Sequence, residues 1–176
     1  MKKKIKKFGW CIIVYGFSGA GKTEISKKIK NEIEKKIGKT ILLDGDNLRN
    51  FFKKIGLKFG YKKKDRDKSV IPKLEILNLF LKNDINVIYP TIFLNKLAIK
   101  KWTKDIDNLI TIHIKSSVNE IIKFGLKRNF YLKEKNIVGK DIKPFFPKKP
   151  SITIRNNFKK NIDKLSKEVI KKLFKK

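Results

Sequence analysis

Apolar residues along the chain form two kinds of pattern. Five short apolar runs have the length and composition of buried β-strands, at residues 10–15, 40–43, 86–89, 109–114 and 151–154. Elsewhere apolar residues recur every three or four positions, as in Ile25, Ile29, Ile33 and Ile37. This period predicts amphipathic helices, which we place at residues 22–37, 47–55, 65–82, 96–104, 118–124 and 158–174.

Strands that alternate with helices favour an α/β fold in which a five-stranded parallel sheet has helices on both faces. A length of 176 residues suits a single domain, spanning 1–176. Residues 125–150 are polar, contain prolines and lack a clear period, so we expect a mobile lid there. The apolar runs are too short to span a bilayer, so we expect no membrane partner.

The first apolar run leads directly into G-x-x-x-x-G-K-[ST], the phosphate-binding loop of nucleoside triphosphatases and kinases. Glycines let backbone N–H groups surround phosphate oxygens, and the following helix N-terminus favours negative charge. The lysine can bridge the β- and γ-phosphates and the threonine can bind Mg²⁺, so ATP and Mg²⁺ are the expected cofactors. The predicted ATP-binding residues are Gly16, Phe17, Ser18, Gly19, Ala20, Gly21, Lys22 and Thr23.

A second motif, Leu-Asp-Gly-Asp-Asn-Leu-Arg at residues 43–49, follows the second predicted strand. Ligands of such sheets bind beyond the carboxyl ends of the strands, so this motif should face the phosphates. Asp44 or Asp46 could organise Mg²⁺ or accept a proton from an attacking hydroxyl, and Arg49 could hold an anionic acceptor.

The formal net charge is +30, which raises the question of a polyanionic partner. Nearly all of this charge is lysine, spread along the whole chain, whereas specific phosphate and base contacts favour arginine. We therefore interpret the charge mainly as compositional drift and expect no specific nucleic acid. Cys11 is the sole cysteine and lies in a predicted strand, so no intramolecular disulfide can form and a cytoplasmic location is expected.

Together the two motifs resemble those of the adenylyl-sulfate kinase family. The resemblance continues at Phe59-Gly60-Tyr61 and Asp65-Arg66, which are similar to the family's Leu-Gly-Phe and Asp-Arg. Residues 136–142, Asn-Ile-Val-Gly-Lys-Asp-Ile, resemble the family's lid segment. The likeness runs from about Trp10 to the C-terminal helix.

The resemblance implies a kinase that transfers the γ-phosphoryl group of Mg·ATP to the 3′-hydroxyl of a nucleotide. It implies Lys22, Asp44 and Asp46 as catalytic residues, with Asp46 as the base and Thr23 and Asp44 at the metal. The implied acceptor contacts are Asp46, Arg49, Tyr61, Arg66 and Ile137, with Tyr61 in place of a stacking Phe.

The acceptor half of the motif set departs from the family pattern. Where the family usually has Glu-Asn-Ile-Arg-Arg, this chain has Lys68, Ser69, Val70, Ile71 and Pro72. Phe93 and Lys96 replace a serine and an arginine after the third strand, and Ile137 replaces the lid's stacking Phe. The acceptor is therefore adenylyl sulfate bound through other residues, or another anionic nucleotide. Relatives that act on cytidine diphosphoramidate in capsule modification make that nucleotide the first alternative.

Two other functions stay open from sequence. The charge would suit a nucleic-acid-binding protein or nucleic-acid kinase, although no basic aromatic groove motif is present. A degenerate regulatory nucleotide sensor is the second, but Lys22, Asp44 and Asp46 are all retained. A homodimer is possible.

Overall fold

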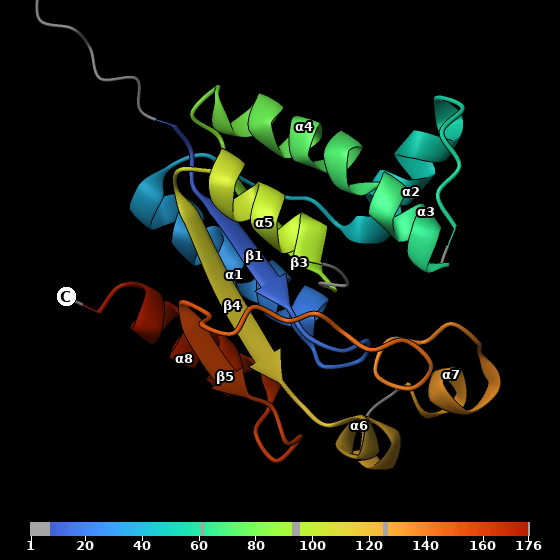
Figure 1. The fold of residues 1–176 in the computed structure, drawn as a ribbon. Coiled ribbons are helices and arrows are strands. Elements are labelled where there is room, and N and C mark those ends of the chain that lie inside the picture. Colours follow the sequence, from blue (N-terminus) through green and yellow to red (C-terminus); the bar gives the residue numbers. More distant parts are fainter. Residues whose placement is uncertain (1–7, 61, 93–95, 125–126, 176) are drawn as a thin grey trace, which may run out of the picture.

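The computed structural model describes residues 8–60, 62–92, 96–124 and 127–175, and within them the chain forms one five-stranded sheet (Figure 1). The strand order is β2-β3-β1-β4-β5, and every pairing is parallel. The strands are β1 (Cys11–Tyr15), β2 (Thr40–Leu42), β3 (Asn86–Thr91), β4 (Leu109–Lys115) and β5 (Ile152–Arg155). This confirms the α/β prediction and each predicted strand to within two residues.

Helices cover both faces of the sheet because alternate side chains of each strand point to opposite faces. Ile12 and Val14 of β1 pack with α1 (Lys22–Ile37), α6 (Val118–Phe124) and α8 (Ile162–Leu173). Cys11, Ile13 and Tyr15 pack with the helices of the other face, α2 (Gly45–Lys54), α4 (Val70–Leu81) and α5 (Lys96–Asp105). In the described ranges each helix is too short or too polar to cross a bilayer.

The parallel strands bring all their carboxyl ends to one edge of the sheet. Two short helices, α3 (Lys63–Lys68) and α7 (Arg128–Lys133), complete the chain order. Figure 1 shows α6 and α7 beyond the arrowhead of β4, at the same end as the turn that follows β1. The phosphate loop and the turn after β2 therefore lie at one edge, as the motif order predicted.

The helix predicted over residues 65–82 is wrong as a single element. The chain forms α3 and α4 with a break at Ser69, whose hydroxyl donates to the Arg66 carbonyl at 2.7 Å. Pro72 lacks the N–H that a continuous helix would need, and it sits instead in the first turn of α4.

The last helix also starts later than the predicted residue 158. Phe158 adopts a positive φ of 63°, and α8 begins only after Asn161, whose side chain accepts from the Lys164 N–H at 2.9 Å. A side-chain cap of this kind sets a helix start more firmly than hydrophobic periodicity does.

The segment predicted as a polar loop, 125–150, holds more structure than its sequence indicated. It contains α7, and Tyr131, Ile137 and Val138 are buried. Phe146 packs against the rings of Tyr15, Phe17 and His113, with centroids 5.1–5.4 Å apart. These contacts attach the segment to the phosphate-loop edge of the sheet. Its mobility stays a prediction.

Asn86 links three elements at the opposite, amino-terminal edge of the sheet. Its side chain accepts from the Trp10 N–H at 2.9 Å and donates to the carbonyls of Ile37, Gly38 and Lys39 at 3.1–3.2 Å. We expect Asn86→Ala to lower the free energy of unfolding by about 2–3 kcal/mol, because buried backbone groups lose their partner.

Urea denaturation measures this effect, with the exposed Asn83→Ala as the matched control, which should change stability by less than about 0.5 kcal/mol. Activity per folded molecule should be unchanged, since Asn86 lies at the edge of the sheet remote from the phosphate loop. An equal free energy of unfolding for Asn86→Ala and Asn83→Ala would show that the hydrogen bonds of Asn86 do not stabilise this edge of the sheet.

Candidate functional site

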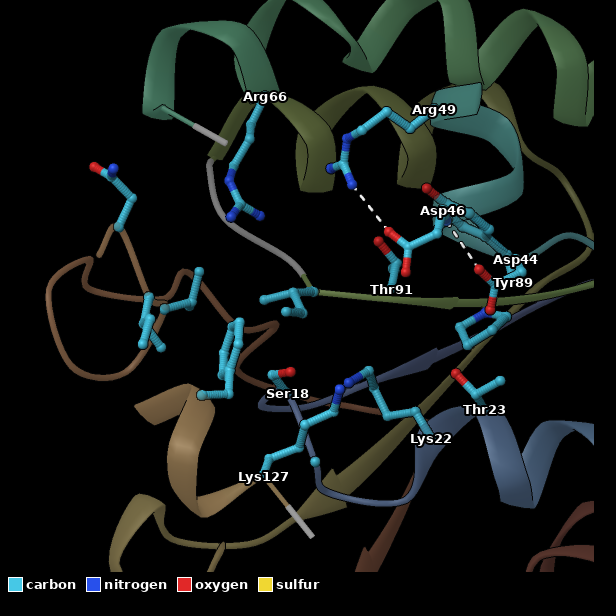
Figure 2. A pocket seen from close by; sticks show the side chains of 18 of the residues that line it. Ser18, Lys22, Thr23, Asp44, Asp46, Arg49, Arg66, Tyr89, Thr91 and Lys127 are labelled. Atoms are coloured by element: carbon cyan, nitrogen blue, oxygen red, sulfur yellow. Dashed lines mark hydrogen bonds and ion pairs between the residues drawn. The ribbon is translucent and has the colours of Figure 1, made fainter. Parts of the chain in front are cut away.

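A cavity of about 1100 Å³ opens at the carboxyl-terminal edge of the sheet. Its wall combines the phosphate loop, the start of α2, the α3–α4 segment, the end of β3 and the segment around α7. Figure 2 shows Lys22, Thr23 and Lys127 on one side of this space and Arg49 and Arg66 on the other, with Asp46 between them. The cavity therefore has two ends rich in cations, separated by a carboxylate.

The phosphate loop turns sharply into α1. Gly21 caps the helix at φ 90°, a left-handed conformation that glycine adopts without steric cost. Lys22 is half-buried and donates from Nζ to the Phe17 carbonyl at 2.8 Å. Burial lowers the pKa of Lys22 to about 8, although Glu24, Asp44 and Asp46 act in the opposite direction. The ammonium thus stands in a site where a phosphate anion would stabilise its charge.

The predicted ATP-binding residues divide into two groups. Ser18, Gly19, Gly21, Lys22 and Thr23 line the cavity. The remaining three do not line the cavity and support the loop instead. Gly16 and Ala20 are buried. Phe17 packs so closely against Gly139 that a Cβ atom on Gly139 would lie 2.6 Å from the Phe17 ring.

The two predicted carboxylates line the cavity in different ways. Asp44 caps α2, because its Oδ1 accepts from the Asp46 N–H at 2.9 Å. Asp46 has a side chain that is 83 % exposed, and its Oδ1 accepts from the Arg49 guanidinium at 2.9 Å. The capping bond orients Asp44, and the ion pair holds Asp46 next to the arginine.

Only some of the residues predicted to contact the acceptor line this cavity. Arg49, Arg66 and Ile137 all line the cavity, as does Ser69. Ile71 is 41 % exposed, and neither it nor Pro72 is part of the cavity wall. Tyr61 and Phe93 lie outside the described residues.

Lys73 also lines the cavity, and sequence reasoning missed it. Four residues of the α3–α4 segment line the cavity: Arg66, Ser69, Val70 and Lys73. They are separated by three, one and three positions, a spacing that places them on one helical face. The same spacing can be found in the sequence, but the family motif covers residues 68–72 and therefore points to Ile71 and Pro72 and not to Lys73.

The segment around α7 forms the third wall and contacts the phosphate loop directly. The Tyr131 hydroxyl donates to the Ser18 carbonyl at 2.9 Å, and the stem of Lys127 lies against Gly19. Ile137 is buried, and its N–H donates to Asp141 Oδ2 at 2.9 Å. These bonds fix an apolar edge of the cavity close to the loop.

The residues present fit a magnesium ion bound together with nucleotide phosphates. Mg²⁺ in such sites takes one or two protein oxygens and fills its other positions with phosphates and water. The Thr23 hydroxyl and the Asp44 carboxylate line the same cavity and are such oxygens. Among the described residues no three His, Cys, Asp or Glu side chains cluster, so no all-protein metal centre is present there.

The comparison with protein families matches the model described as adenylylsulphate kinase over residues 8–155. This span includes the phosphate loop, both carboxylates, both cavity arginines and Ile137. The chain belongs to the adenylylsulphate kinase family. Its members are kinases, so this chain is a nucleotide kinase of that family.

Two curated relatives have nearly the same similarity but different names. The cytidine diphosphoramidate kinase of Campylobacter jejuni is 26 % identical over 173 residues, which cover 96 % of this chain and 99 % of the relative. The adenylyl-sulfate kinase of Clostridium acetobutylicum is 28 % identical over 166 residues, 87 % of this chain and 78 % of the relative.

Solved structures agree on the fold. The adenylyl-sulfate kinase of Mycobacterium tuberculosis, in complex with AMPPNP and APS, superposes with a TM-score of 0.78 at 21 % identity, covering 96 % of this chain and 99 % of that one. The shikimate kinase of Aquifex aeolicus has a TM-score of 0.54 at 18 % identity, covering 93 % and 95 %. The fold is therefore that of P-loop kinases, as predicted.

Lys22 offers a direct test of this site. We expect Lys22→Ala to reduce kcat by roughly 10²-fold or more, because an ammonium directed at transferring phosphate stabilises charge in the transition state. The free energy of unfolding should fall by no more than about 0.5 kcal/mol, since burial of this charge already lowers its pKa to about 8.

Steady-state ADP release measures the effect on kcat. Lys27→Ala, which removes an exposed lysine from the same helix, is the matched control and should retain full activity. Near-normal turnover by Lys22→Ala would remove this cavity as the catalytic centre.

Proposed function

We propose that this chain transfers the γ-phosphoryl group of Mg·ATP to the 3′-hydroxyl of an anionic nucleotide, with a cytidine diphosphate derivative such as cytidine diphosphoramidate as the first candidate. The observation that carries the proposal is one cavity with a phosphate loop at one end, two arginines at the other and Asp46 between them. Such a cavity can hold a phosphoryl donor and an acceptor that face each other across a base.

At the donor end, backbone N–H groups of the loop and Lys22 bind the ATP phosphates. Binding exchanges the carbonyl contact of Lys22 for phosphate oxygens, which restores the charge that burial disfavours. Thr23 and Asp44 would hold Mg²⁺, which would neutralise negative charge that develops on the phosphates. Transfer then depends mainly on position and electrostatic stabilisation.

At the acceptor end, Asp46 accepts the proton of the attacking hydroxyl. Its ion pair with Arg49 uses Oδ1, and most of the side chain is exposed, so a hydroxyl can approach the carboxylate. Arg49 and Arg66 bind the acceptor's anionic groups through planar donors suited to two oxygens at once. This contact would hold the 3′-hydroxyl against the base.

The acceptor's identity rests on the apolar wall. Ile137 stands where the family has a stacking Phe, and it is buried within the core cluster that includes Tyr131. A smaller aliphatic surface suits a pyrimidine better than a purine, because it offers less stacking area. The relative from C. jejuni, similar over nearly the full length of both chains, supports the same choice.

Residues 125–150 act as a lid in this proposal. The described part contacts the loop through Tyr131 and Lys127, so closing of the segment would bring its apolar edge onto both nucleotides and exclude water. The phosphoryl group would then pass to the hydroxyl and not to solvent. A cytoplasmic location, which would supply ATP, and a homodimer remain predictions.

The base assignment is tested by Asp46→Asn. We expect kcat to fall by roughly 10²-fold or more, because an amide cannot accept the proton, while the KM for ATP changes by less than about threefold. Steady-state kinetics with both substrates varied gives both numbers.

Asp84→Asn, an exposed carboxylate in the turn before β3, is the control and should behave as wild type. If ATP binding collapses while residual turnover persists, Asp46 belongs to the metal site and the roles of Asp44 and Asp46 are exchanged.

The acceptor is tested by kcat/KM for cytidine diphosphoramidate and adenylyl sulfate with one enzyme preparation. We expect at least about tenfold higher efficiency with the cytidine compound, because the purine of adenylyl sulfate would lose more of the stacking that a Phe at the position of Ile137 provides, and stacking on an aromatic side chain is worth about 1–3 kcal/mol per base. Comparable or better efficiency with adenylyl sulfate would defeat this choice.

A further inference from the structure

Lys73 is the lysine that α4 turns into the acceptor end of the cavity. It is half-buried and lines the wall together with Arg66, Ser69 and Val70, its partners on one face of the α3–α4 segment. Ile71, at a position where the family has arginine, is 41 % exposed and off that face. The α3–α4 segment therefore supplies a second cation to the cavity, Lys73, in addition to Arg66.

The surroundings of Lys73 are positive. Burial lowers its pKa to about 8, with the nearby charges of Arg49 and Arg66 acting in the same direction and Asp46 against it. Among the described residues, no carboxylate forms an ion pair with its ammonium. Arg49 is already paired with Asp46, but the ammonium of Lys73 is partly buried beside two guanidinium groups, which is costly unless an anion joins it, so this grouping indicates an anionic ligand.

The position of Lys73 assigns that anion to the acceptor and not to ATP. Figure 2 shows Arg49 and Arg66 across the cavity from Lys22 and Thr23. Lys73 lines the same wall as Arg66 and Ser69, and the charges of Arg49 and Arg66 lower its pKa, whereas neither arginine is among the charges that shift the pKa of Lys22; Asp46, which lies between the two ends, acts on both lysines. The donor and acceptor ends thus have separate lysines.

We propose that Lys73 is a further acceptor-binding residue, which binds the two linked anionic groups of the acceptor nucleotide beside Arg49 and Arg66. This inference rests on the proposed function. The ligand class is a nucleotide whose 5′ end carries two linked anionic centres, as in a diphosphate, a phosphoramidate derivative or a phosphosulfate.

The first test is Lys73→Met, which keeps the length of the side chain and removes its charge. We expect the KM for the acceptor to rise about 10- to 100-fold, the factor for one lost charge-assisted hydrogen bond, while the KM for ATP stays within about twofold. Lys73→Arg should restore most of the acceptor affinity. Lys68→Met, an exposed lysine of the same segment, is the matched control for long-range attraction.

An unchanged acceptor KM in Lys73→Met, or equal increases in the KM values of acceptor and ATP, would overturn the inference. So would an effect of Lys68→Met as large as that of Lys73→Met, because the lysine would then act only through the overall field.

A second test uses the wild-type enzyme and needs no turnover. Lysines are acetylated with limiting acetic anhydride at pH 8 and quantified by peptide mass spectrometry, in saturating AMPPNP with and without inorganic pyrophosphate. We expect pyrophosphate to slow acetylation of Lys73 at least fivefold and to leave the exposed Lys27 unchanged.

These measurements separate the two ideas. Protection of Lys73 in an enzyme that phosphorylates neither nucleotide would reject the proposed function and keep the anion site. Turnover of either nucleotide with no protection of Lys73 would reject this inference and keep the proposed function.

Discussion

The parallel pairing of β1 between β3 and β4 is the constraint on which the site depends. These pairings satisfy the backbone groups of a fully buried strand, and they leave all carboxyl ends at one edge. The chain must leave β1 there, and it does so through the phosphate loop into α1. The same edge receives the turn after β2, so residues more than twenty positions apart face one cavity.

At this edge several groups serve the fold and the chemistry together. Asp44 caps α2 and is also a fitting ligand for magnesium. Lys22 donates to the carbonyl of Phe17 and also lines the cavity. Phe17 in turn packs on Gly139, so the loop and the segment after α7 share one contact surface. The same groups therefore hold the loop, the start of α2 and the segment after α7 in place and line or support the cavity.

The distribution of cation types separates general charge from local function. A net charge of +30 comes almost entirely from lysines along the whole chain. Two of the few arginines, Arg49 and Arg66, line the cavity, where a planar guanidinium can contact two oxygens. Lys73 is distinguished from the exposed lysines by its partial burial beside these arginines. The place of a cation in the fold, and not the net charge of the chain, therefore indicates whether it can bind a ligand.

The sequence by itself determined the fold and the place of the phosphate loop in it. Apolar runs and helical periods are local, and the phosphate loop needs only glycines, Lys22 and Thr23 in consecutive positions, so both can be read along the chain. Helical periodicity did not predict the helix break at Ser69 or the start of α8 after Asn161, because a proline and a side-chain cap override periodicity. Only the tertiary structure decided which residues form the cavity wall opposite the phosphate loop. In the fold, Ile71 is exposed to solvent, Lys73 lines the cavity and Ile137 is buried. The sequence could not show this, because the direction of a side chain depends on how the helix or segment that carries it packs against the sheet.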